Sequence, residues 1–264
     1  MKSSALPTDP GELRKLIRQG EFSSNTGGLA PGYLQTNLAI LPRELAFDFL
    51  LFCQRNPKPC PLIEVVDPGS YTPKESAPRA DLRTDVPKYR VYKNGEMTNE
   101  ITDISSYWRS DLVTFLLGCS FTFETAMMNT GISLRHIEAE SNIPMFITNI
   151  NTVPAGMFSG PMVVSMRPIP EDQIVRTIQV TSRFPSVHGA PIHIGDPEAI
   201  GIEDITRPDL GDPVEIKESE VPIFWACGVT PQSVAMNSKP PLMITHSPGH
   251  MFITDRRDEE FSVI

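Results

Sequence analysis

Two segments of the chain place a cysteine just before the start of a predicted helix. Cys119 stands two residues before Phe121, and Cys227 stands three residues before Thr230. The amino end of a helix offers unpaired N–H groups and a partial positive charge, which favour a carboxylate or a thiolate. Cys119 and Cys227 are therefore candidate catalytic thiols, although a buried cysteine can also be simply a small apolar side chain. The candidates for an anion pocket around these turns are Ser120, Gly228, Thr230 and Gln232.

Acid–base chemistry has its candidates in Glu124 and the histidines. Glu124 falls one turn into the first of these helices, where it could cap the helix or serve as a general acid–base. His188 and His193 lie in the densest polar stretch, 188–196, and His246 stands in a similar loop. Two histidines and a carboxylate could hold a metal ion, but this spacing matches no zinc pattern. A loop that lines a pocket is the favoured interpretation, and no metal site is predicted.

The basic residues favour carboxylate binding over lysine chemistry. No lysine occurs between Lys93 and Lys217, which argues against a Schiff-base lysine and pyridoxal phosphate. The planar guanidinium of arginine binds a carboxylate through two contacts. Arg135, beside His136, and Arg167, which follows a predicted strand, are the candidates for holding a substrate carboxylate.

Composition and missing motifs exclude several classes of protein. The chain has 264 residues and a formal net charge of −9, the opposite of what a nucleic-acid or anionic-membrane binder normally carries. It has neither a phosphate-binding loop nor a Gly-x-Gly-x-x-Gly or Gly-x-Ser-x-Gly motif, so ATP, dinucleotide and serine-hydrolase chemistry are poorly supported. No apolar stretch reaches membrane-spanning length. Four cysteines are too few for a disulfide scaffold, and we expect a reduced, cytoplasmic protein.

The elements that must position these residues are short, because 26 prolines interrupt the chain. Capping and turn signals predict helices that begin near Pro10 and Pro42 and a hairpin at Asn94-Gly95. We expect further helices at 108–117 and 121–129, a helix or a helix–strand unit at 170–180, and strands at 144–150 and 162–166. Near the end of the chain, the pattern predicts a strand at 221–227, a helix from Thr230, and strands at 242–245 and 251–254. That order predicts a crossover within a parallel sheet.

Several longer strings resemble one known family. The chain resembles the bacterial hydro-lyase family, which is similar to the D-glutamate cyclase of mitochondria, from about residue 10 to 255. The strings that carry the resemblance are 30–38, 52–62, 117–124, 164–168, 188–191, 224–232 and 244–249.

The resemblance implies both a reaction and a fold. The reaction is cyclisation of D-glutamate, or a similar small amino or carboxylic acid, to 5-oxo-D-proline with loss of water, which needs neither a redox cofactor nor ATP. The implied fold is a layered α/β main domain, residues 1–151 and 205–264, with a smaller α+β subdomain at 152–204. We expect a small carboxylate as substrate, no nucleic-acid or membrane partner, and a homo-oligomer.

This chemistry assigns roles to the candidate residues. Arg135 or Arg167 would hold a substrate carboxylate, and Glu124 or one of His188 and His193 would move protons. Backbone N–H groups beside Cys119 and Gly228 would bind the developing oxyanion. Two alternatives remain open: a racemase that uses Cys119 and Cys227 as opposed bases, and a carboxylate-binding protein without turnover.

Overall fold

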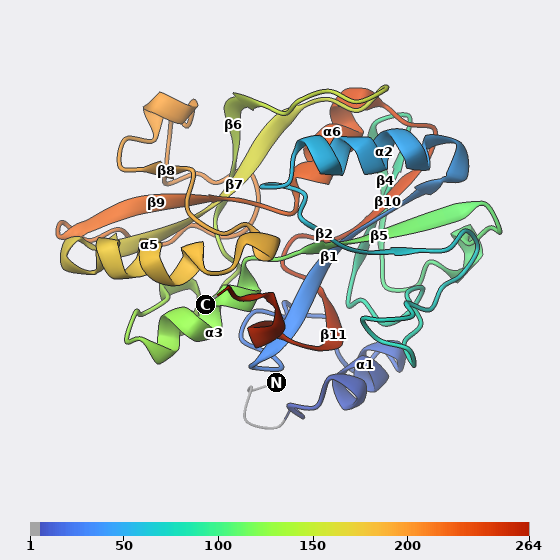
Figure 1. Ribbon diagram of the computed structural model, residues 1–264, viewed down its shortest axis with the longest axis horizontal. Coiled ribbons are helices and arrows are strands. Elements are labelled where there is room, and N and C mark those ends of the chain that lie inside the picture. The colour runs from blue at the N-terminus through green and yellow to red at the C-terminus, as the bar shows by residue number, and fades with distance from the viewer. Residues whose placement is uncertain (1–5, 264) are drawn as a thin grey trace.

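Two antiparallel β-sheets form the centre of the molecule, and helices cover their outer faces (Figure 1). The computed structural model describes residues 6–263. The seven-stranded sheet has the order β2-β5-β1-β10-β3-β4, and β11 also pairs with β1. The strands of this sheet are β1 (Tyr33–Pro42), β2 (Leu62–Val66), β3 (Tyr89–Lys93), β4 (Glu96–Ile101), β5 (Leu112–Gly118), β10 (Met243–His246) and β11 (Phe252–Arg257).

The second sheet has four strands in the order β6-β7-β9-β8. Its strands are β6 (Met145–Asn151), β7 (Pro161–Pro170), β8 (His193–Ile194) and β9 (Glu220–Ala226). The helices are α1 (Pro10–Arg18), α2 (Arg43–Arg55), α3 (Phe121–Asn129), α4 (Arg135–Glu138), α5 (Ile174–Ser182) and α6 (Thr230–Ser238). The mixture of helices and two sheets confirms the expected α/β class. The domain boundaries at 151/152 and 204/205 stay a prediction, since the four-stranded sheet takes strands from Met145 to Ala226.

Strand β1 is the centre of the larger sheet. It pairs with β5 on one side and with β10 and β11 in succession on the other. Its second half, from Leu38 to Leu41, is fully buried and apolar, as expected of a strand covered on both faces. Its first half instead buries Gln35, Thr36 and Asn37. Buried polar groups need partners, so this half of β1 belongs to a polar site.

Local signals set the limits of several elements. The Asp9 side chain accepts a hydrogen bond from the Glu12 amide at 2.9 Å and caps α1, and Pro42 immediately precedes α2. Asn94 and Gly95 both have positive φ and turn β3 into β4, which confirms the predicted hairpin. The predicted helices at α3, α5 and α6 and the predicted strands at β6, β7, β9, β10 and β11 are also confirmed.

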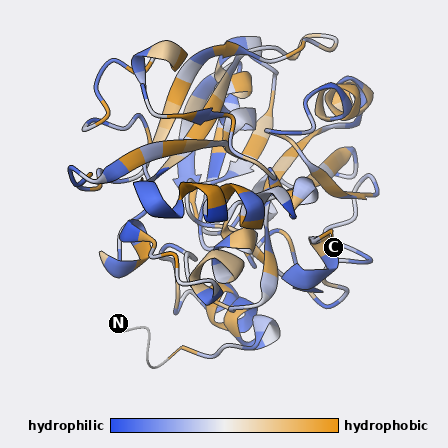
Figure 2. Ribbon diagram, turned by 60° about the vertical axis from the view of Figure 1, so that its left-hand side comes forward, coloured by the Kyte–Doolittle hydropathy of each residue, from blue (hydrophilic) through white to orange (hydrophobic). Residues whose placement is uncertain are grey.

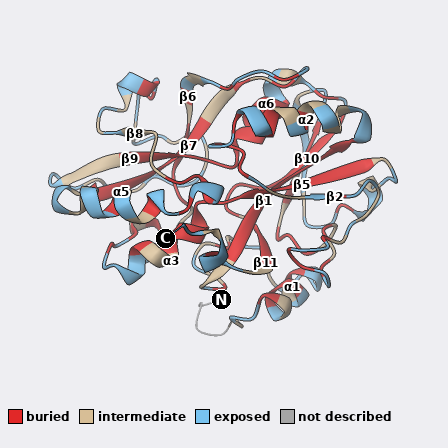
Figure 3. Cartoon of the chain, viewed as in Figure 1, coloured by how far each residue is buried: buried red, intermediate tan, exposed pale blue. Residues whose placement is uncertain are grey.

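Buried residues lie mainly on the strands, and the helices turn exposed residues outward (Figure 3). Many residues of the strands are hydrophobic (Figure 2). One core cluster packs Phe49 and Phe52 of α2 against Phe115 of β5. Another packs Phe123 of α3 against Leu34 and Trp225. Because Leu34 belongs to β1 and Trp225 to β9, the second cluster joins the two sheets.

Two predicted features are wrong. The segment 108–117 was expected to be helical, but residues 112–118 form β5. A short, continuous apolar run does not distinguish a buried strand from a buried helix, and pairing with β1 and β2 decides it here. The parallel crossover is also wrong, because β9 and β10 belong to different sheets and every strand pairing within residues 6–263 is antiparallel. Helix α6 carries the chain from one sheet to the other.

Asn37 of β1 contacts the turns that follow β5 and β9. Its Nδ2 donates to the carbonyl of Gly118 at 2.6 Å. Its side chain also fills the space beside Gly228, where an added Cβ would fall directly on the Asn37 amide. Position 228 therefore requires glycine for steric reasons. This contact fixes the two turns that carry Cys119 and Cys227.

We expect Gly228→Ala to lower the free energy of unfolding by about 1–3 kcal/mol, because the new methyl group must displace the Asn37 amide. Thermal and urea denaturation would measure it. The control is Gly11→Ala in α1, where a new Cβ would lie 3.2 Å from Asp9 Oδ1, a contact that a small shift relieves, and where alanine favours the helix. The double variant Gly228→Ala/Asn37→Ala should lose less stability than the sum of its parts. If the stability losses of the two single variants add up fully in the double variant, the steric contact between Asn37 and residue 228 does not affect stability.

Candidate functional site

A buried ion pair joins α3 to β7. The side chains of Glu124 and Arg167 are 2% and 1% exposed. Arg167 donates to Glu124 Oε1 through Nε at 3.0 Å and also through Nη2. Nη2 reaches Ser120 Oγ at 3.1 Å, and Nη1 reaches Ser165 Oγ at 3.3 Å. Each terminal nitrogen of the guanidinium therefore has at least one partner, and all of these contacts bind it to protein groups.

Two aromatic rings enclose the guanidinium. The Arg167 Cζ lies 5.3 Å from the centroid of the Phe123 ring and 5.1 Å from that of Trp225. These rings exclude water and add cation–π attraction. Removing one partner of such a buried pair leaves an uncompensated charge, which costs about 3–5 kcal/mol. Glu124 and Arg167 consequently depend on each other for their position.

The pKa of Glu124 is set by opposing effects. Burial alone raises it, but the attraction of His136 and Arg167 outweighs burial and holds the pKa below its ordinary value. His136 Nε2 lies 3.1 Å from Glu124 Oε1. All of these contacts use Oε1. Glu124 Oε2 is buried and accepts no hydrogen bond from any residue in the described range 6–263.

The two cysteine thiols belong to one buried apolar cluster. The Phe121 amide, at the start of α3, donates to Cys119 Sγ at 3.5 Å. Burial raises the pKa of the Cys119 thiol far above its ordinary value and that of Cys227 to about 11. Both groups are therefore protonated thiols at neutral pH, in contrast to the thiolates that helix ends can favour.

His188 lies beside the same site in a strained turn, with φ of +84°. Its Nδ1 is 2.7 Å from the Lys58 carbonyl, which can only accept, so Nδ1 carries the proton. Burial lowers the His188 pKa to about 4, and the charge of Arg167 contributes to the lowering. The ring is therefore neutral at pH 7. Its Nε2 then holds a buried lone pair that has no partner among residues 6–263.

Other predicted residues lie apart from this ion pair. Arg135 pairs with Glu220 at 2.5 Å and with the Glu215 carbonyl at 3.0 Å, which ties α4 to the start of β9. His193 lies on β8, where its Nε2 is 2.5 Å from the Asp196 carbonyl. Within the described part of the chain, no hydrogen bond or ion pair links either residue to Glu124 or Arg167.

Three further predicted residues connect α6 to its surroundings. Thr230 Oγ1 donates to the Cys227 carbonyl at 2.7 Å, and Gln232 Nε2 donates to the His246 carbonyl at 2.8 Å. The Leu38 amide donates to His246 Nδ1 at 3.2 Å. Burial lowers the pKa of His246 to about 3, so this ring is also neutral. These contacts hold the start of α6 against β10 and β1.

Three buried polar residues of the site, Gln35, Asn37 and His136, have no role in the prediction from sequence. Gln35 and Asn37 lie two residues apart on β1, so both point to the same face of the strand. A pair of polar residues at that spacing in an apolar strand was the available signal. His136 contacts Glu124, whereas its neighbour Arg135 pairs with Glu220, because adjacent positions on a helix point in different directions.

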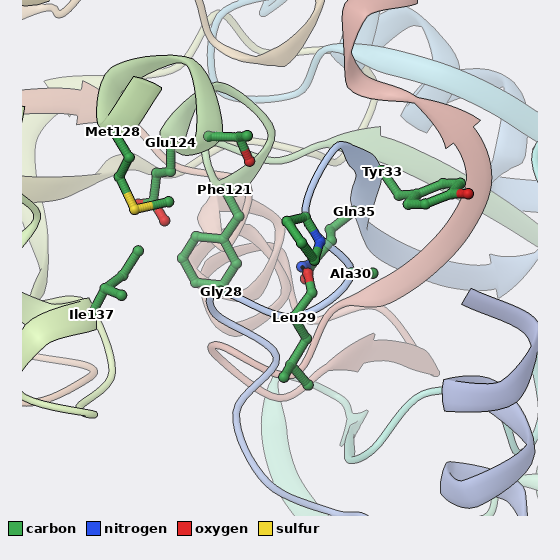
Figure 4. A pocket seen from close by; sticks show the side chains of 11 residues that line it. Gly28, Leu29, Ala30, Tyr33, Gln35, Phe121, Glu124, Met128 and Ile137 are labelled. Carbon is green, nitrogen blue, oxygen red and sulfur yellow. Dashed lines mark hydrogen bonds between the residues drawn. The ribbon is translucent and has the colours of Figure 1, made fainter. Parts of the chain in front are cut away.

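A small crevice opens beside Glu124, between α3 and the segment that leads into β1 (Figure 4). Its volume is about 20 Å³, which is room for about one water molecule. Phe121, Gln35 and the loop from Gly28 to Pro31 line it together with Glu124. Glu124 is only 2% exposed, so the crevice gives little access to its carboxylate.

The described part of the chain has neither a metal-binding cluster nor a membrane-spanning helix. Within 6–263, no three His, Cys, Asp or Glu side chains are placed to hold a metal ion together. Over the same range, no helix has the length and apolar character needed to cross a membrane.

Comparison with known proteins decides the family. The model of the D-glutamate cyclase family matches residues 113–255. The chain belongs to the D-glutamate cyclase family. The matched range contains Cys119, Glu124, Arg167, His188 and Cys227, whereas Gln35 and Asn37 precede it.

Bacterial relatives match over nearly the whole chain. A protein of Bacillus licheniformis is 66% identical over 255 residues, which cover 97% of each chain. One from Geobacillus kaustophilus is 64% identical and covers 98% of this chain and 99% of its own. One from Bacillus subtilis is 59% identical and covers 97% and 99%. All three bear the name "Putative hydro-lyase". Among solved structures, a nitrogen repressor-like protein from Methanococcus jannaschii aligns at a TM-score of 0.37 with 9% identity.

The neutral buried histidines predict a pH dependence of stability. The pKa of each is near 6.5 when unfolded and is lowered to about 4 for His188 and about 3 for His246 when folded. Between pH 6.5 and these values the unfolded chain binds more protons. Stability must then fall as pH falls, by up to about 1.4 kcal/mol per pH unit for each histidine.

His188→Asn and His246→Asn should each reduce the slope of the unfolding free energy against pH by up to about 1.4 kcal/mol per pH unit, because each removes one group that takes up a proton on unfolding. Asparagine tolerates the left-handed backbone at 188 and offers an oxygen where Nδ1 of His246 accepts. Urea denaturation at intervals from pH 7 to 4.5 measures the slope. A slope unchanged in both variants would show that the two rings take up protons equally well in the folded protein.

Proposed function

We propose that this protein converts D-glutamate to 5-oxo-D-proline and water. The observation that carries the proposal is the buried Glu124 carboxylate, which Arg167 holds through one oxygen while the other remains unpartnered beside a crevice. Membership of the D-glutamate cyclase family and the names of the relatives support the substrate and the loss of water.

The reaction needs proton transfer in two directions. The nitrogen of the α-amine attacks the side-chain carboxyl carbon, so that an N–C bond forms and one C–O bond breaks. The ammonium loses two protons in total, and the leaving oxygen takes up two protons and departs as water. Atoms and charge balance without an oxidant, a reductant or a nucleotide. The enzyme must remove protons at nitrogen, supply them at oxygen, and hold the chain in a ring-like shape.

The residues beside the ion pair suit these tasks. Glu124 Oε2 can accept a hydrogen bond or proton from the amine, and the His188 Nε2 lone pair is a second acceptor. The protonated thiols of Cys119 and Cys227 can donate toward the leaving oxygen, together with backbone amides at the starts of α3 and α6. In this proposal Arg167 positions Glu124, since its guanidinium already has protein partners. Arg135 would not hold the substrate.

The protonation of the thiols favours cyclisation over racemisation. A racemase with two cysteine bases needs one of them as a thiolate. Burial raises the pKa of both Cys119 and Cys227, to about 11 in Cys227, so that state is costly at neutral pH. A thiol that only donates a hydrogen bond can be replaced by a serine hydroxyl.

Proton NMR of the purified protein with D-glutamate and, separately, L-glutamate tests the proposal. We expect ring-methylene signals of 5-oxoproline to grow with the D isomer only. Absence of product from both isomers, with binding retained, would support a carboxylate-binding protein without turnover. Solvent deuterium at the α-carbon without ring formation would support racemisation.

Variants then test the assigned roles. Glu124→Gln should lower kcat by about 10²–10⁴-fold, because the amide accepts a proton poorly. Cys119→Ser and Cys227→Ser should keep kcat within about tenfold, whereas a two-base racemase would lose its activity. Thermal unfolding of each variant controls for loss of structure. Full turnover by a folded Glu124→Gln variant would overturn the assignment of Glu124.

A further inference from the structure

Helix α2 turns apolar side chains toward solvent. Phe47 is 73% exposed, the largest exposed fraction of any large apolar side chain in the described range 6–263. Leu50, three residues later, is 38% exposed and neighbours Phe47 on the helix surface. The opposite face of α2 already buries Phe49 and Phe52 in the core. A single exposed apolar side chain is ordinary, but a contiguous group of them marks an interaction surface.

The connection between β6 and β7 extends this apolar surface. Its Val153 is 53% exposed and its Met157 is 37% exposed. The backbone here is fixed to the end of α2, because the Val153 amide donates to Asn56 Oδ1 at 2.8 Å and Asn56 Nδ2 donates to the Val153 carbonyl at 2.9 Å. A Cβ at Gly156 would lie 2.0 Å from the Asp48 carboxylate, so the connection passes directly against α2.

Helix α6 borders the same surface with Met236, which is 44% exposed. The next residue, Asn237, donates to the Ser159 carbonyl at 2.9 Å, and the Ser159 amide donates to Ser238 Oγ at 3.0 Å. Helices α2 and α6 and the β6–β7 connection share one core cluster and lie on the same side of the larger sheet (Figure 1). Five exposed apolar side chains define this surface, here named the α2 face: Phe47, Leu50, Val153, Met157 and Met236.

The charges of α2 suit a second copy of the same chain. The helix carries two basic and two acidic side chains, which sum to zero: Arg43, Arg55, Glu44 and Asp48. The whole chain carries −9, so two copies repel each other over most of their surface and approach most easily at a neutral face. Among residues 6–263, no ion pair holds Arg43, Glu44 or Asp48. Arg55 donates only to the carbonyl of Pro154.

The order of these charges fits a two-fold axis. Glu44 and Arg55 are both exposed and lie at opposite ends of α2. Their separation of eleven residues is about three helical turns, so both point to the same side of the helix. When two α2 helices pack antiparallel, Glu44 of each copy lies opposite Arg55 of the other. The apolar side chains of both copies then lie between the two charge pairs.

We propose that the α2 face is a two-fold interface with a second copy of this chain. The proposal goes beyond the proposed function and does not depend on it. Phe47 is the aromatic anchor of the apolar centre, and Glu44 and Arg55 pair across the rim. Because both copies use the same surface, each contact occurs twice.

Sedimentation equilibrium of the full-length protein from about 1 to 100 µM tests the interface and gives the dimer Kd. We expect a mass of twice 29.3 kDa at the highest concentration. Phe47→Asp should weaken the dimer by at least about thirtyfold, as expected for an aromatic anchor. The matched control is Val175→Asp on α5, which is 66% exposed but lies outside the α2 face and should keep the wild-type Kd. Thermal unfolding of each variant checks that it is folded.

Reversal of the rim charges tests the identity of the partner. Glu44→Arg alone and Arg55→Glu alone each place like charges opposite one another, and each should weaken the dimer by at least about tenfold. An equimolar mixture of the two variants should recover dimers, because both rim contacts then join an arginine to a glutamate. This recovery needs no change in the fold of either variant.

Each outcome decides for or against the interface. A wild-type protein that stays monomeric at the highest concentration overturns the proposal, and so does a dimer whose Kd Phe47→Asp leaves unchanged. A mixture that dimerises no better than the single variants overturns the antiparallel pairing of α2. A monomer that sediments with lipid vesicles, and loses this binding in Phe47→Asp, would assign the α2 face to a membrane surface instead.

Discussion

The ion pair between Glu124 and Arg167 is the interaction on which the rest of the site depends. It joins α3, which follows the larger sheet, to β7 of the smaller one, and both charges are almost fully buried. Because either charge alone would be strongly destabilising there, the pair fixes the two sheets in one arrangement. The ion pair also keeps the Glu124 carboxylate ionised, and its contacts use only one of the two carboxylate oxygens. The other oxygen is buried and has no hydrogen-bond donor among residues 6–263.

Strand β1 supplies the complementary part of the site. Its apolar half forms the centre of the larger sheet, and its polar half carries Gln35 and Asn37. Asn37 fixes the two cysteine-bearing turns through Gly118 and Gly228, while Gln35 Nε2 donates to the carbonyls of Thr26 and Leu29. A single strand thus links the packing of the core to the polarity of the site.

The start of a helix is the feature that the sequence predicts most accurately. The turn before Phe121 predicted α3 and with it Cys119, Ser120 and Glu124, because capping and periodicity are local signals. The sequence predicts a helix where β5 lies, because a short apolar run has no informative period and long-range pairing decides its state. Gln35 and Asn37 were missed for a related reason: a strand buried on both faces hides the alternation of its sides. His136 faces Glu124 and Arg135 does not, and tertiary packing decides this. The spacing of residues in the sequence does not predict it.

The ionisation state of Glu124 is the most direct test of the buried ion pair with Arg167. Carbon NMR of the protein with ¹³C-labelled glutamate side chains, assigned through Glu124→Gln, would follow its carboxyl from pH 8 to 4. The account predicts that Glu124 stays ionised down to below its ordinary pKa of 4.5 and that its signal shifts when D-glutamate binds. Protonation of Glu124 near neutral pH, without a signal change on addition of D-glutamate, would contradict this prediction. A protonated Glu124 would form no ion pair with Arg167 and would have no ionised second oxygen.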